Sequence, residues 1–180
     1  MHNALWLLLA VSGLALAQDG GRYGFGSVAT AQELSPFVSP LPDGRGLPPG
    51  SGSVQAGKEL YATQCLACHG AKLEGGQGDR LIGGRGSLAG SDPAKAPIKT
   101  VESYWPYATT LFDYIKRAMP LTTPGSLSND QVYALCAYIL SEAKIIPESA
   151  TLDARSLAAV KMPNRDGFVA DPRPEKFPTP

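Results

Sequence analysis

The sequence predicts an all-α fold of three or more helices, with extended segments at both ends of the chain. Helix signals occur in three stretches of the 180 residues, around residues 54–68, 111–118 and 128–144, whereas strand signals are weak and no internal repeat is found. Glycine and proline are frequent over residues 18–52, and proline recurs after residue 146. These residues predict irregular straps on either side of the helical part.

The first two helices have recognisable boundaries. The first is expected over residues 54–68, with Ser51 or Ser53 near its start. Four apolar side chains at helical spacing define the second helix: Leu111, Tyr114, Ile115 and Ala118. This pattern stops at Met119, because the residue before a proline disfavours helical geometry and Pro120 follows.

The last helix has the clearest start. Ser128 and Gln131 form a capping-box pattern, in which each side chain can accept a hydrogen bond from the backbone N–H of the other residue. One apolar stripe follows: Val132, Leu135, Cys136 and Ile139. We expect this helix to end near residues 142–144.

Cys65, Cys68 and His69 form a C-x-x-C-H motif, the attachment sequence of a covalently bound c-type haem. Two thiols three residues apart lie on one side of a helical turn, so each can form a thioether with one vinyl group of the porphyrin. His69 then lies beneath the ring, where its imidazole can bind the iron as the proximal ligand. We therefore expect one covalent haem c, with the glycine-rich residues 70–100 packed against its edge rather than forming a long structureless loop.

Three other sites could use the same cysteines. A structural zinc ion needs four ligands, and beyond the motif the chain offers only Cys136 and His2. A thioredoxin-like dithiol would need a βαβ context, whereas the residues before Cys65 predict a helix. A disulfide between Cys65 and Cys68 is compatible with their spacing but leaves His69 without a role.

The N-terminal residues predict export. Residues 4–17 form an uncharged apolar run that ends in Ala-Leu-Ala, which is typical of a secretory signal peptide cleaved before Gln18. The run is too short to cross about 30 Å of hydrocarbon as a helix, so no transmembrane anchor is expected. The first three residues depart from the usual pattern because they lack Lys and Arg. We expect residues 1–17 to be removed and the protein to reach the bacterial periplasm or the outer side of the cytoplasmic membrane.

The remaining chain is long enough for one domain with extensions. We expect a glycine- and proline-rich arm over residues 18–52, a monohaem domain over 53–146, and an extended proline-rich tail over 147–180 with a turn at 164–167. Apolar side chains in the arm favour an ordered strap over a flexible linker. The 16 Lys and Arg balance the 16 Asp and Glu, which argues against nucleic-acid binding because that function requires a basic surface.

The second axial ligand decides between electron transfer and binding of small molecules. Because His2 lies in the expected signal peptide, the candidates are Met119 and Met162. Met119 ends a helix just before Pro120, where the chain turns and a side chain can project over the ring, so it is favoured over Met162 in the tail. An open sixth position is the third alternative.

Cys136 and an aromatic cluster are left after these assignments. Cys136 lies in an apolar stripe, which favours a buried and inert small side chain over a disulfide to a partner or a reactive thiol. Residues 104–107 read Tyr-Trp-Pro-Tyr and are expected to pack around the macrocycle.

Several of these residues resemble class I cytochrome c. They are the motif at residues 65–69, Gly57 with Tyr61, Met119 with Pro120, and Leu135 with Tyr138. A narrower resemblance extends from about residue 42 to residue 168 and is carried by residues 42–48, 83–86, 104–114, 117–120 and 162–168. These segments resemble the cytochrome subunits of bacterial sulfite dehydrogenase and the cytochrome domain of the sulfur dehydrogenase in thiosulfate-oxidising systems.

The resemblance implies a class I cytochrome c-like fold in which the first and last helices cross at the glycine. It also implies an electron-transfer protein or subunit, not an enzyme by itself. The expected donor is a molybdenum-containing sulfite or sulfur dehydrogenase, and the expected acceptor is a terminal oxidase or another cytochrome. Many such cytochromes have proline two residues before Leu81, where this chain has Asp79; we expect the Asp79 carbonyl to accept the N–H of His69.

Three functions remain as alternatives to a carrier in sulfur oxidation. The chain could be an open-site haem protein of peroxidase-like or gas-binding type, which would require that Met119 does not bind the iron. It could be a general respiratory cytochrome c unrelated to sulfur oxidation. It could also be a subunit whose haem only supports assembly.

Overall fold

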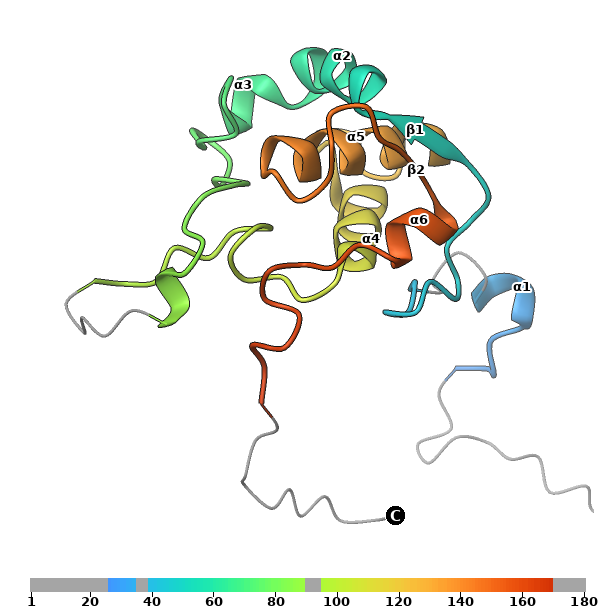
Figure 1. Ribbon diagram of the computed structural model, residues 1–180. Helices are drawn as coiled ribbons and strands as arrows, with labels where there is room; N and C mark the ends of the chain where they lie inside the picture. Colours follow the sequence, from blue (N-terminus) through green and yellow to red (C-terminus); the bar gives the residue numbers. More distant parts are fainter. Residues whose placement is uncertain (1–25, 35–38, 90–94, 170–180) are drawn as a thin grey trace, which may run out of the picture. The chain divides into compact units, whose positions relative to one another are not determined.

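The computed structural model describes residues 26–34, 39–89 and 95–169 (Figure 1). The expected signal peptide, residues 1–17, lies outside the described residues, as do parts of the expected arm and tail. The chain divides into two units, Met1–Phe37 and Val38–Pro180. In the first unit the described part holds one short helix, α1 (Ala31–Leu34), which has no buried residue. Among the described residues no helix is long and apolar enough to cross a membrane.

The second unit is mainly helical, as predicted. Its elements include α2 (Val54–Gln64), α3 (Leu66–His69), the short 3-10 helix η2 (Ser87–Ala89), α4 (Ala108–Ala118), α5 (Asn129–Glu142) and α6 (Ala154–Ala158). The predicted capping box is present at the start of α5: the Ser128 hydroxyl accepts from Gln131 N, and the Gln131 side chain accepts from Ser128 N. Ser53 is the N-cap of α2 and accepts from Ala56 N.

The helix expected over residues 54–68 is interrupted, and that prediction was wrong in this detail. Cys65 leaves helical geometry with φ −125°, so α2 ends at Gln64 and the motif continues on the separate short helix α3. The Cys65 carbonyl accepts from both Cys68 N and His69 N, at 3.1 and 3.0 Å, which starts a tighter turn at this residue. The C-x-x-C-H motif therefore lies on a separate turn rather than at the end of a continuous helix.

The core is centred on the crossing of α2 and α5 (Figure 1). A Cβ placed on Gly57 would lie 1.9 Å from the Ala134 carbonyl oxygen, so the two backbones approach closely at this position. The rings of Tyr61 and Tyr138 pack beside the crossing, with centroids 5.1 Å apart. The crossing at the glycine is therefore as the family resemblance implied.

A small antiparallel sheet was not predicted. It joins β1 (Ser51–Ser53) to β2 (Thr151–Asp153), with Gly52 opposite Leu152. Each strand has only three residues, which is too short for an alternating pattern to be recognised in the sequence. The pairing brings the chain before α2 against the chain after α5.

The expectation of an extended tail from residue 147 was also wrong over its first part. After β2, Asp153 accepts from Ser156 N and the Ser156 side chain accepts from Asp153 N, a capping box that starts α6. Four apolar side chains of this region are buried: Leu152, Leu157, Val160 and Met162. Residues 151–162 therefore belong to the folded body, because burial of these side chains stabilises the segment. The expected turn at residues 164–167 is present, with Gly167 N donating to Asn164 O at 3.1 Å.

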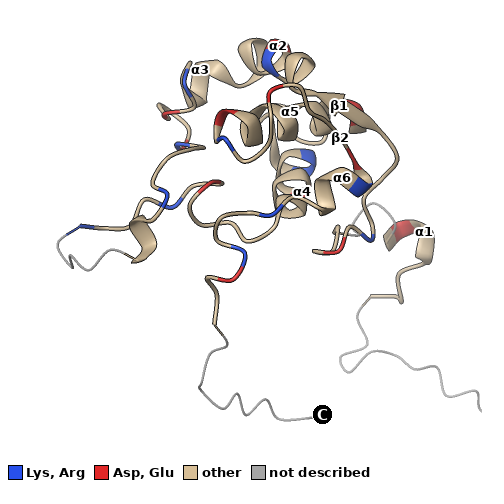
Figure 2. Ribbon diagram, in the orientation of Figure 1, with Lys and Arg blue, Asp and Glu red and all other residues tan. Residues whose placement is uncertain are grey.

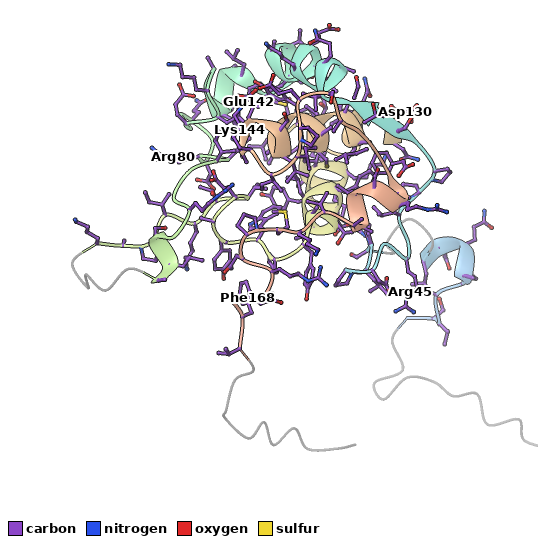
Figure 3. The ribbon with its side chains drawn as sticks, viewed as in Figure 1. Arg45, Arg80, Asp130, Glu142, Lys144 and Phe168 are labelled. Carbon is purple, nitrogen blue, oxygen red and sulfur yellow. The ribbon has the colours of Figure 1, made fainter. Side chains whose placement is uncertain are left out.

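Residues 39–52 form the ordered strap that was expected of this part of the arm. The Tyr133 hydroxyl donates to Pro48 O at 2.8 Å, and Asn129 donates to Pro49 O at 3.2 Å. Asp130, labelled in Figure 3 at the start of α5, accepts from Ser51 N at 2.7 Å. These bonds tie the strap to α5, the helix at the centre of the core.

Candidate haem site

A cavity of about 590 Å³ lies in the second unit, within the size range of cofactor sites. Its lining comes from α2, α3, α4, α5 and the loops between them. The sequence-predicted residues in that lining are Cys65, Cys68, His69, Trp105 and Met119. Apolar side chains complete the walls, among them Leu81, Val101, Ile115, Leu127, Leu135 and Ile139.

Cys65 and Cys68 are both free thiols and border this one cavity. Burial, with a smaller contribution from the negative charge of Cys68, raises the pKa of Cys65 to about 11, so this thiol is protonated at neutral pH. No disulfide joins the pair. Within the described ranges, no three His, Cys, Asp or Glu residues come together as a metal-ion site.

His69 is held by the loop that follows α3. Its Nδ1 lies 2.7 Å from the carbonyl oxygen of Asp79, and this contact confirms the hydrogen bond expected at a position where many relatives have proline. A carbonyl can only accept, so Nδ1 carries the proton and the lone pair of Nε2 is left for a ligand. This is the arrangement that an iron-binding histidine requires.

Gly78 is a site residue that the sequence reasoning missed. A Cβ on Gly78 would lie 2.8 Å from Cε1 and 3.0 Å from Nδ1 of His69, so the backbone of residue 78 packs directly against the imidazole ring. Eight glycines between residues 70 and 90 look alike in the sequence. The one feature of the sequence that could have identified Gly78 is its position immediately before Asp79, the residue expected to accept a hydrogen bond from His69.

The structure separates the two candidate methionines. Met119 is the C-cap of α4 and lines the cavity. It therefore reaches the cavity from a different helix than the cysteine motif. Met162 is only 3% exposed and packs in the hydrophobic core, outside the cavity lining. Met119 is therefore the methionine that shares a cavity with Cys65, Cys68 and His69.

The aromatic side chains of residues 104–107 lie in two different environments. Trp105 lines the cavity and contacts Tyr114, another lining residue, with ring centroids 5.7 Å apart. Tyr104 and Tyr107 are not in the lining and instead contact the C-terminal segment. Trp105 is therefore the residue of this cluster that lines the cavity expected to hold the macrocycle.

Tyr61 was also missed as a lining residue. Its hydroxyl donates to the carbonyl of Gly70 at 2.7 Å, which ties α2 to the residue that follows the motif. Burial raises the pKa of Tyr61 above its ordinary value, so the phenol stays protonated and keeps this bond. Cys136, in contrast, is fully buried outside the cavity lining, and burial raises its pKa, as expected of an inert core thiol.

Three ionisable side chains besides the motif residues and tyrosines border the cavity: Asp79, Arg80 and Lys99. Arg80 lies on the loop after α3 (Figure 3). Over the described ribbon as a whole, Lys and Arg are interspersed with Asp and Glu (Figure 2). This mixture agrees with the balanced composition of the sequence.

These residues fit a covalently attached haem. The cavity is mainly apolar, it presents two free thiols at the motif spacing, and the histidine beside them has an unblocked Nε2. Met119, at the C-terminal end of α4, brings a thioether side chain to the lining of the same cavity. The donor set of nitrogen and sulfur suits iron in a porphyrin.

Comparisons with known proteins found a matching family and similar proteins. Residues 52–139 match the family described as cytochrome c oxidase, cbb3-type, subunit III. A chain in the crystal structure of the sulfane dehydrogenase SoxCD from Paracoccus pantotrophus is 41% identical, with a TM-score of 0.74, over 83% of this chain and 73% of that chain. A thiosulfate dehydrogenase from Stutzerimonas stutzeri (strain A1501) is 31% identical over 99 residues, which are 52% of this chain but only 29% of that protein.

Proposed function

This chain belongs to the c-type cytochromes and is related to the electron-transfer components of sulfur dehydrogenases, and on that premise we propose that it is a periplasmic monohaem carrier of single electrons. Cys65 and Cys68 would hold the haem, and His69 and Met119 would bind its iron. The observation that carries the proposal is the convergence of two free thiols, an oriented imidazole and a thioether on one cavity.

The haem supplies an iron that accepts and releases one electron at a time. The chain contributes attachment, orientation and exclusion of water. Cys65 and Cys68 tether the group through thioethers, so it is retained in both oxidation states. Asp79 orients His69 through Nδ1, and a soft sulfur ligand from Met119 favours electron transfer over binding of small molecules. The apolar side chains that line the cavity make the surroundings of the haem less polar. A less polar environment favours the reduced haem, because the reduced haem carries less charge than the oxidised one.

The proposed donor is a molybdenum-containing sulfite or sulfur dehydrogenase, and the proposed acceptor is a terminal oxidase or another cytochrome. The 41% identity to a chain of the sulfane dehydrogenase supports the donor. The sulfur-dehydrogenase resemblance over about residues 42–168 supports it independently of the haem motif. The secretory pattern of residues 1–17 supports a periplasmic location.

Haem reduction in a reconstituted system tests the proposal. The purified, oxidised protein is mixed with a candidate sulfite dehydrogenase, or with a candidate sulfane dehydrogenase, and then with the sulfur substrate of that enzyme. We expect reduction of the haem only when enzyme and substrate are both present, and a slower reaction with an unrelated reductase as the control. Reduction by dithionite together with no reduction by either enzyme would refute the proposed donor while leaving electron transfer intact.

A further inference from the structure

The segment after α6 returns to the aromatic cluster and contacts it in three places. Asn164 donates from Nδ2 to the carbonyl oxygen of Tyr104 at 2.6 Å. The ring of Phe168, labelled in Figure 3, meets the ring of Tyr104 edge-on, with centroids 5.2 Å apart. The guanidinium of Arg165 lies 5.0 Å from the centroid of the Tyr107 ring. The segment is therefore bound to the chain on both sides of residue 105.

Trp105 lies between these contacts and has a different environment. Its side chain lines the haem cavity, whereas the side chains of Tyr104 and Tyr107 do not. The hydrogen bond from Asn164 is made to the carbonyl of the peptide that links Tyr104 to Trp105. The position of that peptide helps to determine where the indole ring lies in the cavity wall.

Asn164 is itself held in place from two directions. A Cβ on Gly167 would lie 1.8 Å from Oδ1 of Asn164, so the amide fits only because residue 167 has no side chain. Gly167 N also donates to Asn164 O at 3.1 Å, which closes the turn. Two residues before Asn164, Met162 is buried in the core and anchors the segment there.

We propose that Asn164 is a positioning residue of the haem site, which acts through the Tyr104 carbonyl to hold Trp105 in the cavity wall. The proposal rests on the proposed function only in that a haem occupies the cavity. An indole in the wall keeps water from the haem, and exposure of a haem to water stabilises the more highly charged oxidised state. Loss of the Asn164 bond therefore lowers the reduction potential without changing any iron ligand.

Two substitutions remove the same bond by different routes. Asn164→Ala deletes the donor, whereas Gly167→Ala leaves the amide in place but forces it away from Tyr104. Asp166→Ala, an exposed position in the same turn, is the matched control. The chain has two tryptophans, Trp6 and Trp105. Because Trp6 lies in the expected signal peptide, Trp105 is the sole source of indole fluorescence in the exported protein.

The midpoint potential is measured by potentiometric titration, and the fluorescence of Trp105 is compared with that of the same protein unfolded. We expect Asn164→Ala and Gly167→Ala each to lower the potential and to increase the fluorescence, since movement of the indole away from the haem weakens quenching. The double variant should shift no further than the larger single shift, because both changes break one interaction. Asp166→Ala should match the parent protein.

Normal haem content with an unchanged potential and unchanged fluorescence in Asn164→Ala would overturn the proposal. A reduced free energy of unfolding with an unchanged potential would also overturn it, because that result assigns Asn164 a merely structural role. If the potential shifts of the two single variants add up in the double variant, the two substitutions do not act through the same Asn164–Tyr104 hydrogen bond, and the proposal is refuted. Absence of covalent haem from the parent protein would instead refute the proposed function, and the two failures are therefore distinguishable.

Discussion

The carbonyl oxygen of Asp79 lies 2.7 Å from Nδ1 of His69. The contact fixes both the tautomer and the rotation of the imidazole, and it does so with a backbone atom that any residue at position 79 would supply. Gly78, the preceding residue, packs its backbone against the same ring. Two consecutive residues of the loop after α3 thus orient the imidazole of His69, one by a hydrogen bond and one by close packing.

Gly78→Ala tests this packing. Because the added Cβ would lie 2.8 Å from Cε1 of His69, we expect the imidazole to be displaced and the bond to iron to be weakened. Covalent haem should still be incorporated, since Cys65 and Cys68 are unchanged, but the reduction potential should differ from that of the parent protein. Potentiometric titration with absorption spectra measures the effect.

Gly76→Ala is the control for strain in the same loop, because its Cβ would approach the Cys68 carbonyl, at 3.0 Å, rather than the ring. Equal potentials for Gly78→Ala and the parent protein would contradict the assigned role of Gly78.

Met119→Ala and Met162→Ala distinguish the two methionines. We expect Met119→Ala to lose the far-red sulfur-to-iron absorption band of the oxidised protein and to bind added small ligands, because the sixth position is opened. Met162→Ala should keep the band but lower the free energy of unfolding by about 2–5 kcal/mol, the cost of truncating a buried methionine. Absorption spectra and chemical denaturation measure the two effects. The reverse result, with the band lost only in Met162→Ala, would show that the ligand assignment is wrong.

Gly57→Ala should destabilise the protein even though alanine is the better helix former. Within a helix the exchange normally stabilises by roughly 1 kcal/mol. At this position the Cβ would meet the Ala134 carbonyl at 1.9 Å, and forced separation of α2 and α5 should cost about 1–3 kcal/mol or more. Lys58→Ala, on the exposed side of the same helix, is the control and should be near neutral. An increase in the free energy of unfolding for Gly57→Ala would contradict the close crossing.

The N-cap of α6 predicts a dependence of stability on pH. Hydrogen bonds from Ser156, the backbone N–H first and then the side chain, lower the pKa of Asp153. A carboxyl whose pKa is lower in the folded protein stabilises the fold above its unfolded pKa of about 3.9, and this contribution is lost as the pH falls through the lower folded value. Asp153→Asn keeps a capping side chain but cannot titrate.

Denaturation of both proteins at neutral pH and at about pH 2 measures the effect of Asp153. The parent protein should exceed the variant in stability by more at neutral pH than at the acid pH. A difference that does not change with pH would exclude Asp153 as a source of the dependence.

The features determined by the sequence itself are local ones. The spacing of Cys65, Cys68 and His69 indicated the haem because thioether attachment and axial ligation depend on neighbouring residues of one turn. The start of α5 followed from Ser128 and Gln131, since a capping box is made within four residues. The acceptor for His69 could also be expected, because it is a backbone carbonyl at a position defined by the family resemblance.

Only the tertiary structure decided the features that depend on contacts between distant segments. It placed Met119 in the cavity and Met162 in the core, selected Gly78 among many similar glycines, and divided the residue 104–107 cluster into one lining residue and two anchors. The β1–β2 pairing and the bond from Asn164 to Tyr104 join residues about 100 and 60 positions apart. Such contacts join segments that are far apart in the sequence, so no local spacing or periodic pattern marks the residues that make them.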